Sequence, residues 1–185
     1  MTLTVNNLLP ASGSEISIPS GHRLSHQGKV VQTVYVRSDA RPTYSALPSG
    51  DGTQITQLNL TITPTRTDST IWLRWSLFYE VNHDCVFLVQ RNSTLVGYNT
   101  YRGNVRHSGI LTPKYDNDYS STPQNDTVNW FDRPSSTSSI TYQIAIRSAN
   151  TGTHTFALNR TVGSAGADTG HEVGVSWGFA REISG

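Results

Sequence analysis

The sequence has a single cysteine, Cys85, few charged residues and few apolar ones. One cysteine cannot form an intrachain disulfide, which excludes the disulfide framework of small secreted domains. Charged residues make up 15% of the chain and the formal net charge is +1. Without a strong electrostatic field, we expect no binding to nucleic acid or to a membrane surface. Hydrophobic residues make up only 35%, and no apolar run approaches the roughly 20 residues that span a bilayer.

The first 29 residues lack the basic start and apolar centre of a signal peptide. We therefore expect a protein that works inside the cell that makes it, or that leaves by assembly into a particle released by lysis. This segment is poor in large apolar residues, except in "EISIPSGHRL", where Ile16 to Ile18 could pair as a short strand. We interpret residues 1–29 as an extended arm and residues 30–185 as the head domain.

No segment of the sequence shows the apolar periodicity of an amphipathic helix. Segments that run ten residues without Gly, Pro or a Ser/Thr cluster alternate with period two, which is typical of strands. In "TIWLRWSLFYEV" one face is apolar from Ile71 to Val81, and the opposite face still carries Trp72 and Phe78. The expected strands lie at residues 30–36, 58–63, 70–81, 85–91, 95–99, 127–131, 139–149, 154–160 and 172–183. This succession predicts an all-β fold, a β-sandwich or jelly roll.

Two segments between these strands are predicted as long loops. Residues 37–54 contain two prolines and "SGDG", and residues 100–126 are the least regular part of the chain. Long excursions in a compact domain are usually functional or interfacial. Tyrosines in and beside the second loop are candidates for surface recognition. They could stack on sugars or lie in a subunit interface, and we favour the interface because tyrosine is enriched at interfaces. These candidates are Tyr98, Tyr101, Tyr115 and Tyr119.

The stretch "GVSWG" at residues 174–178 fits the G-x-S-x-G motif of serine esterases. That motif requires a sharp turn from a strand into a helix, with the acid and the histidine later in the chain. Here it lies within an alternating strand on which Val173, Val175, Trp177 and Phe179 share one face, and no histidine follows. We therefore expect Ser176 to be structural, and the two glycines to permit close approach of backbone or aromatic neighbours.

Other candidate sites are also incomplete. His22 and His26 have a metal-binding spacing only on a helix, and His83 with Cys85 lacks further ligands. A glycoside hydrolase needs two opposed carboxylates, for which only a few acids near the irregular region qualify. We interpret those acids as turn-capping residues and expect no enzyme activity, no metal and no cofactor. They are Asp116, Asp118, Asp126 and Asp132.

From about Val30 to its end, the chain resembles the jelly-roll module of many bacteriophage virion proteins, whose fold is like that of tumour necrosis factor and the complement head. "GKVVQTVYV" resembles the first strand of that module, and "LNLTITPTRTDSTIWLRWSLFYEV" its strand pair around a "TP-x-x-x-x-S" turn. "CVFLVQRNSTLVG" resembles its hairpin, and "WFDRPSSTSSITYQIAIRSANTGT" its "D-x-P" segment before a strand with an early tyrosine. "LNRT…VGVSWGFAREIS" resembles the closing strand pair.

The resemblance implies a homotrimer without enzymatic chemistry. A trimer would bury the second face of the strands at residues 71–81 and 172–183, where small residues permit close packing. The expected interface residues are Trp72, Phe78, Gly174, Gly178 and Ala180.

The resemblance also implies a place in the virion, assembled in the host cytoplasm. Because only about 29 residues precede the head, we expect a capsid decoration (cement) protein whose partner is the major capsid protein or a tail component. The alternative is a short tail fibre or receptor-binding tip that binds a host surface glycan. The arm residues expected to make the attachment are Ile16, Ile18, His22 and Leu24.

Overall fold

The computed structural model describes residues 27–100, 108–115, 122–163 and 171–185. The predicted attachment residues of the arm, together with Tyr101, Tyr119, Asp116 and Asp118, lie outside these ranges. Within them the chain forms strands and one short 3₁₀ turn, η1, at Thr56–Leu58. The strands are β1 (Val30–Ser38), β2 (Thr43–Ala46), β3 (Thr53–Gln54), β4 (Leu60–Ile62), β5 (Thr70–Val81), β6 (Cys85–Arg91), β7 (Thr94–Gly97), β8 (Gln124–Asp132), β9 (Ile140–Ser148), β10 (His154–Leu158) and β11 (Ser176–Ile183).

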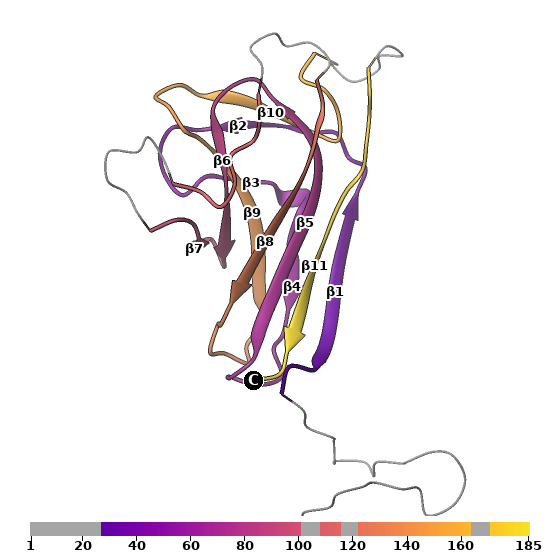
Figure 1. The fold of residues 1–185 in the computed structure, drawn as a ribbon, viewed down its shortest axis with the longest axis vertical. Coiled ribbons are helices and arrows are strands. Elements are labelled where there is room, and N and C mark those ends of the chain that lie inside the picture. Colours follow the sequence, from indigo (N-terminus) through magenta and orange to yellow (C-terminus); the bar gives the residue numbers. More distant parts are fainter. Residues whose placement is uncertain (1–26, 101–107, 116–121, 164–170) are drawn as a thin grey trace, which may run out of the picture.

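The strands form two antiparallel sheets packed face to face, so the predicted all-β sandwich is confirmed (Figure 1). The first sheet has the order β1–β11–β5–β10–β2, with β8 also paired to β5. The second has the order β3–β9–β6–β7, with β4 also paired to β9. β2 and β3 lie within the segment predicted as a loop, which is a correction. No helix in the described part of the chain has the length and apolar character to cross a membrane.

The long strand β5 supplies the centre of the core, as its alternation predicts. Ile71, Leu73, Trp75, Leu77 and Tyr79 are all at most 1% exposed. They pack against the inner face of the second sheet, where β6 and β9 contribute the other large side chains. The indole N–H of Trp75 donates to the backbone carbonyl of Leu58 at 2.9 Å, so the largest core side chain has no unpaired polar atom.

The last strand, β11, presents the face opposite to the predicted one. In its register with β5, Gly178 lies beside Trp75 and Ala180 beside Leu73, so both small residues lie on the inner face. Ala180 is fully buried, whereas Trp177 is 39% exposed on the outer face. A Cβ atom at Gly178 would lie 2.6 Å from Cδ1 of Trp75. The bulk of Trp75 thus requires a small neighbour, and the apolar residues of β11 point outward.

Both ends of the head lie at the same end of the sandwich (Figure 1). The backbone N–H of Gly28 donates to the carbonyl of Ser184 at 2.8 Å, and that of Ser184 to the carbonyl of Lys29 at 2.9 Å. The fully buried carboxylate of Glu182 holds this end together. It accepts hydrogen bonds from the side chains of Gln32 and Ser69 and from both the backbone and the hydroxyl of Thr65, at 2.6–2.7 Å. The chain therefore enters the head beside its own C-terminus.

Candidate functional site

The outer face of the first sheet carries aromatic and arginine side chains in rows that cross four strands. One row is Thr33, Arg181, Trp72 and Phe131, and the next is Tyr35, Phe179, Arg74 and Asn129. The third row is Arg37, Trp177, Ser76 and Thr127. The strands that contribute are β1, β11, β5 and β8. We call this surface the aromatic face and define it by Tyr35, Trp72, Arg74, Phe131, Trp177, Phe179 and Arg181.

The rings of the aromatic face contact one another within the monomer. Trp72 stacks on Phe131 with ring centroids 5.9 Å apart and meets the edge of Phe179 at 5.1 Å. Tyr35 nevertheless remains 83% exposed and Phe131 59% exposed. Solvent-exposed aromatic groups gathered on one rigid sheet are typical of an interaction surface.

The arginines of this face lie on its rings. The guanidinium carbon of Arg181 is 4.3 Å from the ring centroid of Phe179, and that of Arg74 is 5.8 Å from that of Trp177. The three rows contain three arginines and no acidic residue. The Nε atom of Arg74 is buried and has no hydrogen-bond partner among the described residues.

The predicted interface residues are divided between two environments. Trp72 lies on the aromatic face, as expected, and Phe78 is on the same side of β5. A Cβ atom at Gly174 would lie 2.3 Å from Cγ of Phe78, so Gly174 permits the backbone to cover this ring. Gly178 and Ala180, by contrast, are buried in the monomer, and the prediction that they lie on the outward face is wrong. The predicted close approach of both glycines to aromatic neighbours is confirmed.

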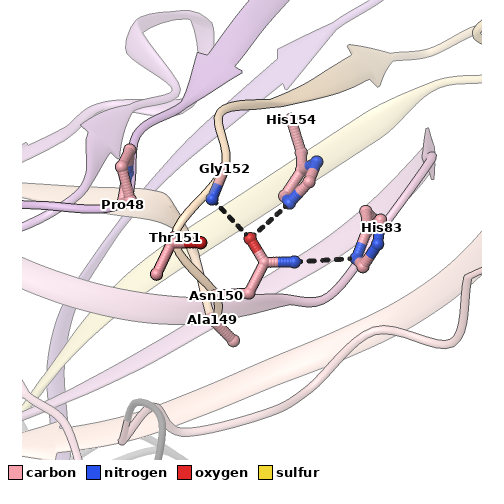
Figure 2. Close-up of a pocket in the computed structure, with 7 residues that line it drawn as sticks. All are labelled: Pro48, His83, Ala149, Asn150, Thr151, Gly152 and His154. Atoms are coloured by element: carbon pink, nitrogen blue, oxygen red, sulfur yellow. Dashed lines mark hydrogen bonds between the residues drawn. The ribbon is translucent and has the colours of Figure 1, made fainter.

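A pocket of about 870 Å³ lies at the end of β5 that is remote from the chain termini. Its lining comes from three turns, after β2, between β5 and β6, and between β9 and β10. Figure 2 shows the side chain of Asn150 hydrogen-bonded to one ring nitrogen of His83 and to one of His154. The two rings stack with centroids 4.3 Å apart, and Tyr115 stacks on His83 at 5.2 Å. The lining residues are Pro48, His83, Ala149, Asn150, Thr151, Gly152 and His154.

The two tyrosines of the predicted recognition loop that the structure describes are separate from each other. Tyr115 packs on the main core and on His83. Tyr98 packs instead against a smaller cluster of Val86, Leu88 and Ala145 on the opposite face of the second sheet. Whether these tyrosines meet a ligand stays a prediction.

Ser176 is a structural residue. It is fully buried, accepts a hydrogen bond from the backbone N–H of Phe78 at 2.9 Å and donates to Oδ1 of Asn159 at 2.7 Å. The amide of Asn159 in turn donates to the carbonyls of Ser38 and Ala40. The motif "GVSWG" therefore joins β11, β5 and the ends of β1 and β10.

Ser176→Ala should lower the free energy of unfolding by about 1–3 kcal/mol, because it leaves Oδ1 of Asn159 and the N–H of Phe78 without their partner in the core. Ser45→Ala, at an exposed position of β2, is the matched control and should stay within ~0.5 kcal/mol. Urea unfolding of both variants measures the difference. Unchanged stability together with loss of an esterase activity would contradict the structural role.

The other candidate catalytic and metal-ligating residues make contacts within the fold. Asp132 accepts hydrogen bonds from Arg91 at 2.9 Å and Tyr142 at 2.7 Å, and Asp126 accepts one from Tyr79. Six residues apart on one strand, the two carboxylates are about 20 Å from each other, too far for a glycosidase pair. Burial raises the pKa of Cys85 to about 12. No group of three metal-ligating side chains occurs in the described ranges.

Local sequence patterns predict neither the aromatic face nor the pocket. Tyr35 and Phe131 appear as ordinary strand residues until the register aligns them with Trp72 and Phe179. Asn150 lies in "NTGT", which the sequence predicts only as a turn. No protein-family model matches the chain, and no curated protein matches it in sequence.

Proposed function

We propose that this chain is a non-enzymatic structural protein of a bacteriophage virion, a homotrimer that decorates the capsid and is anchored by its N-terminal arm. The observation that carries the proposal is the aromatic face. Its three central rows contain aromatic residues and arginines and no acidic residue. This composition is typical of the buried centre of a protein interface. The virion assignment rests on the resemblance described above.

A second copy of the chain is the occupant that we propose for the aromatic face. Tyr35 at 83% exposure and Phe131 at 59% leave apolar area in water that another copy would cover. In a cyclic trimer each contact joins two different parts of the surface, and the aromatic face, which extends over four strands, has two sides that could supply them.

The position of the chain termini agrees with attachment through an arm. Residues 28 and 29 pair with Ser184 at one end of the sandwich. Rotation about an axis along the strands would place the three arms at the same end. Three arms acting together would raise the apparent affinity for a particle far above that of one.

Cosedimentation with particles tests the proposed function. The particles are assembled from a phage genome that lacks this gene. The unaltered chain should sediment with them, and the full-length double variant Ile16→Asp, Ile18→Asp should remain in the supernatant with an unchanged oligomeric mass. Ser12→Asp with Ser14→Asp is the matched control and should still sediment. No cosedimentation of the unaltered chain would overturn the virion proposal, and cosedimentation of the Ile16/Ile18 variant would overturn the anchor.

The second candidate function is a short tail fibre or receptor-binding tip. One observation favours it: the pocket is lined by His83, which follows the end of β5 at Val81, whereas residues 28 and 29 and the C-terminus lie at the end where β5 begins (Figure 1). The 12 residues of β5 separate these ends by roughly 36 Å. A protein attached through its arm would therefore present this pocket outward.

A further inference from the structure

We infer that the pocket lined by His83 and His154 is a binding site for a neutral sugar. The inference rests on the second candidate function, binding of a host glycan, and assigns it to this pocket in place of the tyrosine loop.

The hydrogen bonds of Asn150 fix how both imidazoles are protonated. The backbone N–H of Gly152 donates to Oδ1 of Asn150 at 2.7 Å, so this atom is an acceptor. Nε2 of His154, also 2.7 Å from Oδ1, must therefore carry a proton and donate it. The acceptor left on His154 is Nδ1.

The opposite arrangement holds on His83. Its Nδ1 accepts from the backbone N–H of Asp84 at 2.8 Å and from the Asn150 amide at 3.0 Å, so it carries no proton. The proton of neutral His83 is then on Nε2, which is a donor. Burial lowers the pKa of His154 below its ordinary value, and this favours the neutral ring, in which Nδ1 is an acceptor.

The lining thus carries one ring N–H donor, on His83, and one ring acceptor, on His154, and the hydrogen bonds to Asn150 hold both rings in place. A sugar hydroxyl both donates and accepts, so two neighbouring hydroxyl groups match this pair. Pro48 and Ala149 add apolar lining for the C–H surface of a ring. None of the lining residues is Lys or Arg, and the carboxylate of Asp84 lies 3.8 Å from Nδ1 of His83, which favours a neutral ligand over an acidic one.

The turns that carry these groups are already ordered. The backbone N–H of Ala149 donates to the carbonyl of Asp84 at 2.9 Å, and that of Ser148 to the carbonyl of Leu47 at 3.0 Å. These bonds join the three turns around the pocket. A preformed site avoids the ordering cost that weakens binding by flexible loops.

Titration of the full-length protein with simple glycosides tests the inference. The probes are the methyl glycosides of glucose, galactose, mannose and N-acetylglucosamine, with N-acetylneuraminic acid as the charged comparison. We expect saturable, millimolar binding of at least one neutral probe, monitored by NMR through the ring nitrogen resonances of His83 and His154. Both resonances should move, and the charged sugar should bind more weakly.

Variants assign the binding to the pocket. Asn150→Ala should weaken it about tenfold or more, because both imidazoles lose their fixed orientation. His154→Phe keeps the ring and removes the acceptor, and should weaken binding similarly with little loss of stability. Tyr98→Ser, outside the pocket, is the control and should bind normally. Binding lost only with Tyr98→Ser would overturn this site and keep the glycan function. No binding of any probe would overturn both, and neither result bears on assembly through the aromatic face.

Discussion

A negative charge placed on the aromatic face is expected to convert the assembled protein into monomers. In Tyr35→Asp the carboxylate would have to enter the contact between copies, where an unpaired buried charge costs several kcal/mol. Tyr35 is 83% exposed in the monomer, so the substitution should leave folding intact. We expect association at least ~100-fold weaker, which corresponds to about 2.7 kcal/mol. Sedimentation velocity measures the change.

The control for this experiment carries the same charge elsewhere on the surface. Leu47→Asp replaces a side chain that is 45% exposed and lies in the turn after β2, away from the aromatic face. It should keep the mass of the unaltered protein. Phe131→Asp, on β8 at the opposite side of the aromatic face and 59% exposed, should behave like Tyr35→Asp. If both variants on the aromatic face keep the original mass, copies of the chain do not meet there.

Glu182→Gln should lower the free energy of unfolding at neutral pH by about 2–3 kcal/mol. The change removes the negative charge from an acceptor of four hydrogen bonds and brings an N–H group against other donors. The variant is close in shape to the native residue, so packing changes little. Asp39→Asn, which removes an exposed ion pair with Arg37 at 3.7 Å, is the control and should cost at most ~0.5 kcal/mol.

The cost of Glu182→Gln should depend on pH in a defined direction. Burial raises the pKa of Glu182, but the hydrogen bonds from Ser69, Gln32 and Thr65 lower it by more, so the net pKa lies below its ordinary value. The carboxylate therefore stabilises the fold fully above its unfolded pKa of about 4.3, and this contribution disappears as the pH falls through the lower folded pKa. Urea unfolding at neutral and acid pH should show the two proteins converging in acid. A difference that grows in acid would contradict this account.

The sequence predicts β5 completely and β11 in the wrong orientation, for one physical reason. In β5 the alternation of large apolar residues coincides with burial, because these side chains fill the centre of the sandwich. β11 lies beside β5, and the volume next to Trp75 is already occupied, so glycine and alanine take the inner positions. The hydrophobic pattern of one strand does not show how large the side chains are that the neighbouring strand places beside it.

Long-range pairing accounts for the other differences. β2 and β3 are short and lie among prolines and glycines, and they form strands because β10 and β9 lie beside them. His83, Asn150 and His154 come from two turns that meet only through the strand order. The residues of the pocket and of the aromatic face lie far apart in the sequence, and the pairing of the strands brings them together.

The mass of the unaltered, full-length protein in solution tests the central claim most directly. Sedimentation equilibrium over a wide range of protein concentration should give three times the chain mass of 20.3 kDa, with dissociation only on dilution. A single species of 20.3 kDa at every concentration would contradict it. The aromatic face would then be open to a different partner, and the trimeric virion protein proposed here would be excluded.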